Sequence, residues 1–197
     1  MKRNWFARHP IGFMALYFLL YLSAFNFLET QISMPRVLLV HCRLDDLIPF
    51  CKYAILPYFA WFAWIPFTLF YLLWKAPRED FWRLCLPLFG GMTIALACYV
   101  ILLYRTDTAT NVCPSIHVFN SVTLMLAYHR CRLFEEPRRR WMRPAADVLC
   151  FSIVCSTMLL KQHSCIDVVL GALLALVLDA LFNRAAERSE QPQIWHA

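Results

Sequence analysis

Charged residues are scarce in this chain: Asp, Glu, Lys and Arg make up 16% of its 197 residues. Soluble domains carry about 25% charged and about 45–50% apolar residues, whereas 60% of the residues here are hydrophobic. The shortage of charge excludes an ordinary soluble domain. The abundance of Leu, Phe and Trp excludes a disordered or collagen-like chain.

Glycine is also rare, with only four residues, and no glycine-rich loop is present that could cradle a nucleotide phosphate. This excludes a dinucleotide-binding enzyme of the usual kind. The nine cysteines form neither a CxxC pair nor a Cys/His cluster at zinc spacing. Most lie inside apolar runs, where free cysteine is usually a small buried hydrophobe. We therefore expect no metal and no other cofactor.

The chain does contain six apolar runs, each close to the length of about 20 residues that crosses a bilayer as a helix. A lone strand would leave backbone groups unsatisfied in lipid, so all six runs are predicted to be helices. The sequence thus predicts an all-α fold, a six-transmembrane-helix bundle forming one domain over residues 1–197, with a short tail at 184–197. The predicted spans are 11–28, 53–74, 84–104, 116–133, 145–160 and 166–182.

The basic residues are distributed unevenly between the two ends of the predicted spans. Fourteen of the nineteen Lys and Arg residues fall on the side that holds both termini. The positive-inside rule places this side in the cytoplasm of a cell membrane. The run Arg138–Arg140 is then a topology anchor, and no nucleic-acid partner is expected. The outer side holds only Arg36, Arg43, Lys52, Arg105 and Lys161.

The segment Glu29–Lys52 is the longest outer connection. Its apolar patches Met34–Val40 and Leu44–Phe50 predict a re-entrant or interfacial helix packed over the bundle. Asp45 and Asp46 lie on the same side. They either position a polar headgroup or belong to a solvated turn.

Two outer elements carry residues suited to chemistry. Pro114-Ser115-Ile116-His117 stands at the head of the fourth predicted span, and the turn Lys161–Asp167 joins the fifth span to the sixth. Both elements lie at the same end of the predicted bundle. We therefore expect His117 and His163 to come together although they are 46 residues apart.

The second element has the composition of a phosphoryl-transfer site. His163 and Asp167 are spaced i, i+4 at a helix start, so the carboxylate can orient the imidazole and leave its other nitrogen as a nucleophile. Lys161 and the free N–H groups of the helix head favour an anion. His117 is then the general acid.

Simpler interpretations exist for each motif alone, since His often forms hydrogen bonds at the membrane interface and Ser115 is an ordinary helix N-cap. The two motifs on one face favour the catalytic interpretation. A metal site built from His117, His163, Asp107 and Asp167 is disfavoured because Lys161 would repel the cation.

Pro114-Ser115-Ile116-His117 resembles the P-S-x-H signature of the type-2 phosphatidic acid phosphatase superfamily. The Lys-Gln-His turn with Asp167 and Gly171 resembles that family's His-x-x-x-Asp motif, and is closest to its bacterial phosphatases and inositol phosphorylceramide synthase relatives. The resemblance covers essentially the whole chain, because the family fold is a six-helix membrane bundle. It implies that His163 becomes phosphorylated and Asp167 orients it, that His117 protonates the leaving group, that Ser115 holds phosphate oxygens, and that no metal is needed.

The chain departs from the family pattern at two points. Ser156 is followed by Thr157 where the family has Arg. The family's first motif, Lys followed by Arg-Pro, is not visible. Lys161 is expected to replace the first missing charge, and Arg105 is the best placed of the outer cations to replace the second.

The predicted function is hydrolysis of a lipid phosphate or diphosphate through a phosphohistidine on the outer face of the membrane. One alternative is a lipid phosphotransferase, similar to inositol phosphorylceramide or sphingomyelin synthase, that uses the same histidine. A second is a non-catalytic membrane scaffold that keeps the fold. The expected partners are the bilayer and the lipid phosphate substrate. The lipid, the acceptor and the oligomeric state are beyond the sequence.

Overall fold

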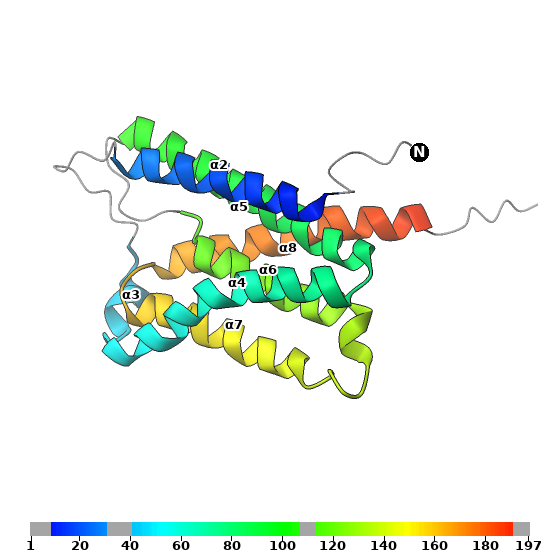
Figure 1. Cartoon of the computed structure of the whole chain (residues 1–197). Coiled ribbons are helices and arrows are strands. Elements are labelled where there is room, and N and C mark those ends of the chain that lie inside the picture. The colour runs from blue at the N-terminus through cyan, green and yellow to red at the C-terminus, as the bar shows by residue number, and fades with distance from the viewer. Residues whose placement is uncertain (1–8, 31–40, 107–112, 191–197) are drawn as a thin grey trace, which may run out of the picture.

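A computed structural model describes residues 9–30, 41–106 and 113–190, with the side chains of Glu29, 102–106 and 184–190 left out. Its described part contains helices and turns and no strand (Figure 1). The elements in chain order are α2 (Pro10–Thr30), α3 (Arg43–Leu47), the 3₁₀ turn η1 (Lys52–Ala54), α4 (Ile55–Lys75), α5 (Arg78–Thr106), α6 (Ile116–Arg130), the 3₁₀ turn η2 (Arg132–Glu135), α7 (Met142–Leu159) and α8 (Cys165–Glu190).

Five of these helices are long and apolar enough to cross a membrane, namely α2, α4, α5, α7 and α8. Their outward faces carry many large apolar side chains, such as Leu56 (73% exposed), Phe151 (71%) and Leu181 (62%). A belt of this kind would be unstable in water and is typical of a surface that contacts lipid. The prediction of an all-α membrane protein is confirmed at this level.

Helix α6 is the shortest of the six long helices, with 15 residues, or about 22 Å at 1.5 Å per residue. It packs against α4, α5, α7 and α8 and so forms the centre of the bundle. Phe119 and Leu124 on α6 are fully buried, as are Leu72 of α4 and Leu88 of α5. Because its neighbours shield it, α6 does not need the length of a lipid-facing span.

The fourth predicted span ends earlier than expected. Helix α6 stops at Arg130 rather than Leu133 because Cys131 adopts extended backbone angles. The chain then turns through η2 and buries Phe134 completely. The Phe134 ring stacks on Tyr128 with 4.4 Å between ring centroids. Packing of an aromatic side chain therefore outweighs continuation of the helix.

The two ends of the bundle differ in content. In Figure 1, the start of α2 and the end of α8 lie at one end of the bundle, and α3 lies at the other. The α3 end collects the heads of α4, α6 and α8 and the last turn of α7. At the opposite end, Arg130 of α6 forms an ion pair with Asp179 of α8. Asn183 supports Asp179 with a hydrogen bond of 3.1 Å.

Helix α3 is the described part of the outer connection between α2 and α4, and it is five residues long. It corresponds to part of the predicted patch Leu44–Phe50. It lies over the turn between α7 and α8, where the backbone N–H of Cys51 donates to Leu159 at 3.0 Å. The other predicted patch, Met34–Val40, lies outside the described residues.

Candidate active site

The heads of α6 and α8 meet closely at the α3 end of the bundle. The backbone N–H of Ser115 donates to the carbonyl oxygen of Asp167 at 3.2 Å. Gly171, one turn further along α8, makes this approach possible, since a Cβ there would lie 2.6 Å from the Ser115 carbonyl oxygen. The two predicted motifs are thus joined through their backbones.

The turn between α7 and α8 is a Schellman motif, which ends a helix with two backward hydrogen bonds. Gln162 N–H donates to Thr157 O at 2.9 Å and Lys161 N–H donates to Met158 O at 3.0 Å. Lys161 takes the left-handed conformation that this motif requires, with a φ of 57°. His163 N–H also donates to Thr157 O, at 3.2 Å. The hydrogen bonds of this turn fix the backbone position of His163, and so the point from which its side chain extends.

Helix α8 begins with a capping box, in which two side chains satisfy the first free N–H groups of a helix. The Ser164 hydroxyl accepts from Ile166 N–H at 3.0 Å. The Asp167 Oδ2 atom accepts from Ser164 N–H at 3.2 Å. Asp167 therefore stabilises the helix start in addition to any role toward His163.

His163 and Asp167 face one another as the i, i+4 spacing predicts. His163 Nδ1 lies 3.6 Å from Asp167 Oδ2, and the two side chains are 8% and 0% exposed. The distance is longer than a hydrogen bond but within the range of a buried electrostatic contact. Because Nδ1 faces the carboxylate, Nε2 is the nitrogen available for another group.

His117 comes from α6 and lies next to His163, with 5.7 Å between the ring centroids. Aromatic side chains of α4 form a wall against His117. The Tyr58 ring stacks on the His117 ring with 4.7 Å between centroids, and the Trp61 ring lies tilted to it at 4.3 Å. The predicted meeting of the two histidines is present in the structure. The aromatic wall is an addition that the sequence analysis missed.

Several polar atoms around the histidines are buried and form no hydrogen bond within the described part of the chain. They include both ring nitrogens of His117, Nδ1 of His163, Oδ1 of Asp167, the side-chain amide of Asn120 and the hydroxyl of Ser121. A buried unsatisfied polar group costs about 1–3 kcal/mol. Such a concentration is typical of a site built to bind a polar ligand.

Ser115 is fully buried, and its hydroxyl oxygen caps α6 by accepting from Val118 N–H at 3.4 Å. The neighbouring Cys113 thiol lies beside Asp167. Burial, and then the negative charge of Asp167, raise the pKa of Cys113 to about 12. A thiol with this pKa stays protonated at neutral pH and is a poor nucleophile, so His163 is the better candidate.

Lys161 is exposed, and its ammonium group binds α3 and the residue after it. It donates to the backbone oxygen of Asp45 at 2.6 Å and to that of Ile48. Two of its three N–H donors are therefore occupied by carbonyl groups. Lys161 lies at the same end of the bundle as the histidines, as predicted. Its side chain connects the α7–α8 turn, which carries His163, to the segment that contains α3.

Arg105, the other predicted phosphate-binding cation, falls in the last turn of α5. Its side chain lies outside the described residues, as does the whole of Asp107.

Asp45 is a structural residue of this end of the bundle. Its two carboxylate oxygens accept from the backbone N–H groups of Cys165 and Cys42, each at 2.8 Å. Desolvation opposes ionisation, but the hydrogen bonds together outweigh it and lower the pKa of Asp45 to about 2. Asp45 therefore caps both α3 and α8. This double cap differs from both roles expected from the sequence, a headgroup ligand and a residue of a solvated turn.

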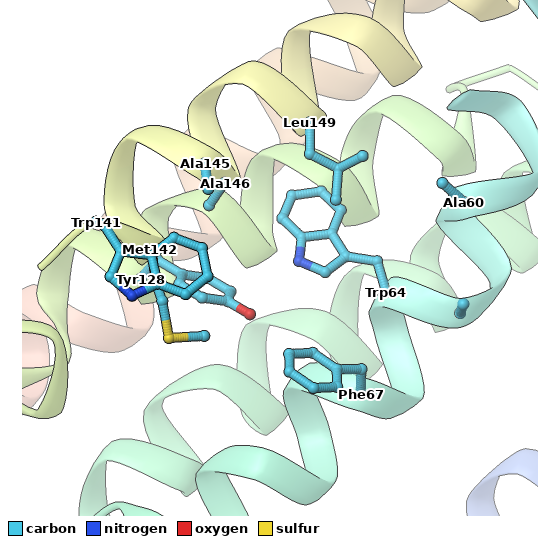
Figure 2. A pocket seen from close by; sticks show the side chains of 10 residues that line it. Ala60, Trp64, Phe67, Tyr128, Trp141, Met142, Ala145, Ala146 and Leu149 are labelled. Atoms are coloured by element: carbon cyan, nitrogen blue, oxygen red, sulfur yellow. The ribbon is translucent and has the colours of Figure 1, made fainter. Parts of the chain in front are cut away.

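Two apolar grooves open on the sides of the bundle. One, of about 400 Å³, lies between α4, α6 and α7 and is lined by aromatic side chains that include Trp64, Phe67 and Trp141 (Figure 2). None of the predicted site residues lines it. The other, of about 520 Å³, lies between α5 and α8 and reaches Cys113 and Pro114, directly before Ser115.

Comparison of the chain with protein-family models, with curated proteins and with solved structures found no match.

Proposed function

We propose that the chain is a membrane lipid phosphatase that hydrolyses a lipid phosphate or diphosphate through a phosphohistidine at His163. One observation carries this proposal. Two partly buried histidines from separate segments lie with their ring centroids 5.7 Å apart, and one of them faces a buried carboxylate. A nucleophile, an orienting group and a proton donor are the groups that phosphoryl transfer from a lipid requires.

The reaction proceeds in two displacements. Nε2 of His163 attacks phosphorus, the bond from phosphorus to the lipid oxygen breaks, and protonated His117 donates its proton to that oxygen. Water then attacks the phosphohistidine while His117 takes a proton from it. Inorganic phosphate leaves and His163 is restored. The carboxylate of Asp167 stabilises the positive charge that His163 carries while it is phosphorylated.

The phosphate group would be held by donors at the heads of two helices. The hydroxyl proton of Ser115 remains available, because only its oxygen is used in the cap of α6. The α8 head adds the positive end of its dipole. Lys161 and Arg105 are the proposed cations. Lys161 would use the N–H that its two carbonyl contacts leave over, or exchange one of those contacts for phosphate.

The groove between α5 and α8 supports a lipid as the substrate. It is apolar, opens on the lipid-facing side of the bundle and ends at Cys113 and Pro114. An acyl or polyprenyl chain in this groove would approach the head of α6 without leaving the membrane. The site would face the outside of the cell, with both termini in the cytoplasm, as the uneven distribution of basic residues favours.

A phosphate-release assay tests the proposal. Purified protein in detergent, with a chelator present, is given phosphatidate, phosphatidylglycerophosphate and a polyprenyl diphosphate in turn. We expect release of phosphate from at least one lipid. His163→Ala should abolish release, and His117→Ala should slow it by about 10²–10⁴-fold, the usual contribution of a general acid.

His129→Gln is the matched control. His129 also contacts a carboxylate, with Nε2 2.7 Å from Asp147 Oδ1, but it stands at the other end of α6, so this variant should keep full activity. A labelled lipid phosphate should also leave an acid-labile label on the wild-type chain and none on His163→Ala. Full activity of His163→Ala, or no release from any lipid, would overturn the proposal. A labelled phosphodiester formed only with an added lipid alcohol would assign the chain to phosphotransfer instead.

A further inference from the structure

A second cluster of reactive side chains lies on the α3 side of the turn, apart from the two histidines. It consists of Cys42, Asp45 and Cys165, whose two sulfur atoms and one carboxylate oxygen all lie within 4.8 Å of one another. We propose that these three residues form a binding site for a soft divalent cation of the zinc class. This inference does not depend on the proposed phosphatase activity.

The distances suit such an ion. Zinc binds thiolate sulfur at about 2.3 Å and carboxylate oxygen at about 2.0–2.2 Å, so ligand atoms around one tetrahedral ion lie about 3.5–3.8 Å apart. The three ligand atoms now lie within 4.8 Å of one another, so each pair would have to approach by at most about 1.3 Å. Both cysteines are free thiols and partly exposed, which gives an ion a way in.

The carboxylate is oriented before any ion arrives. Asp45 accepts one N–H at each oxygen, from the backbones of Cys42 and Cys165, the two residues that supply the sulfur ligands. Each oxygen keeps a further lone pair for an ion. Hydrogen bonds of this kind hold the ligating carboxylates of known metal sites in place.

The local charge also balances. Two thiolates and one carboxylate carry three negative charges, of which a divalent cation neutralises two. The Lys161 ammonium donates to the backbone oxygen of Asp45 at 2.6 Å and so brings a positive charge to one of the three ligand residues. The histidine–aspartate site that Lys161 disfavours has only two negatively charged ligands, whereas the present site has three and leaves one charge for Lys161 to offset. Binding releases the two thiol protons to solvent, so that atoms and charge balance.

Three protein ligands leave the fourth position of a tetrahedral ion open to water or to another ligand. The ion would join the residue before α3 to the first residue of α8, two positions after His163. It would therefore fasten the outer segment onto the turn of the candidate active site. No part of the proposed phosphoryl transfer uses it.

Cobalt(II) is the probe, because it occupies zinc sites and its thiolate complexes absorb light. The full chain, purified in detergent, reduced and stripped of metal, is titrated with Co²⁺. We expect a sulfur-to-cobalt charge-transfer band and tetrahedral visible bands that saturate at one ion per chain, and that Zn²⁺ displaces.

Cys42→Ser and Cys165→Ser should each weaken binding by more than about 100-fold, since even outer-shell partners are worth about 10–100-fold in metal affinity. Cys51→Ser is the matched control, because Cys51 is a free, partly exposed thiol of the same outer segment that is not part of the cluster. It should bind Co²⁺ like the wild-type chain. Asp45→Asn, which removes the charge of the third ligand, should also weaken Co²⁺ binding. Asp46→Asn is its matched control and should bind Co²⁺ like the wild-type chain.

Several results would overturn the proposal. One is the absence of a saturable cobalt band, and another is an equal loss of the band in Cys51→Ser. A third is the finding that Cys42 and Cys165 are joined by a disulfide in the native protein and bind no ion after reduction. Thermal unfolding is the control for folding. A metal-free variant that unfolds at the wild-type temperature has kept its fold, so a lost band in it reflects lost ligands. Phosphate release is measured on the same samples. Because the metal site and the phosphatase activity are separate proposals, either result can hold without the other.

Discussion

The backbone of Lys161 lies in a region that favours glycine, with a φ of 57°. A residue with a Cβ pays about 1 kcal/mol or more for the left-handed conformation. Its side chain offsets this cost, because the ammonium group binds the backbone oxygens of Asp45 and Ile48. Lysine at this position therefore accepts an unfavourable backbone conformation, and its side chain links two segments that are far apart in the chain.

The two contributions of Lys161 can be separated by substitution. Lys161→Ala loses the ammonium and keeps the strained backbone, whereas Lys161→Gly loses the ammonium and relieves the strain. We expect Lys161→Gly to be about 1 kcal/mol more stable to unfolding than Lys161→Ala. Phosphate release should fall to the same level in both, because neither has the cation. Equal stability of the two variants would show that the left-handed conformation carries no cost here.

At the residue scale, local spacing allowed some roles to be predicted and left others hidden. His163 and Asp167 face each other because they are spaced i, i+4 at the start of one helix. His117 was expected next to His163 because both motifs were predicted at the same end of the bundle. The double cap formed by Asp45 could not be predicted, because its partner Cys165 is 120 residues away. The wall formed by Tyr58 and Trp61 depends on the rotation of α4 about its axis, which an apolar run leaves undetermined.

At the scale of elements, the crossing of α6 and α8 decides how the two motifs meet. A Cβ on Gly171 would lie 2.6 Å from the Ser115 carbonyl oxygen and 3.2 Å from the Cβ atom of Val118. Neither neighbour is the flexible end of a side chain. The two helix heads would have to separate, and this would carry His117 away from His163.

Gly171→Ala tests this crossing. Overpacking of this kind costs about 1–3 kcal/mol, so we expect a lower unfolding temperature together with slower phosphate release. Gly90→Ala on α5 is the matched control, because a Cβ there would meet only ring atoms of Phe182 at 3.7 Å or more. It should leave both measurements unchanged. Wild-type activity and stability in Gly171→Ala would contradict the importance of this contact.

Helix positions were predictable because apolar runs mark them directly. The end of α6 was not, since the burial of Phe134 beyond it is a tertiary effect. The short helix α3 was expected only as an interfacial segment, and its place over the α7–α8 turn comes from hydrogen bonds to Lys161 and Cys165.

At the scale of the whole molecule, charge distinguishes the two ends. The end opposite α3 carries arginines of α5, α6, the α6–α7 connection and the start of α7. Some form ion pairs there, such as Arg143 with Glu135 and Arg83 with Glu79. The α3 end offers Arg43, Lys52 and Lys161. By the positive-inside rule, this asymmetry predicts that the more basic end lies in the cytoplasm.

Reporter fusions check the orientation. A fluorescent protein that matures only in the cytoplasm, fused after residue 197, should fluoresce in cells. A phosphatase reporter that folds only outside the cytoplasm should be inactive at the same position. The reverse pair of results would place the candidate active site in the cytoplasm and leave the proposed chemistry to be sought among cytoplasmic lipid phosphates.

The central position of α6 has a consequence for biogenesis. With 15 residues and the buried polar side chains of Asn120, Ser121 and Thr123, α6 is poorly suited to enter the bilayer on its own. Its partners α5 and α8 are made before and after it during synthesis. Entry of α6 into the bilayer would therefore have to be coupled to helix association, so that the helix that carries His117 reaches its central place only as the bundle assembles around it.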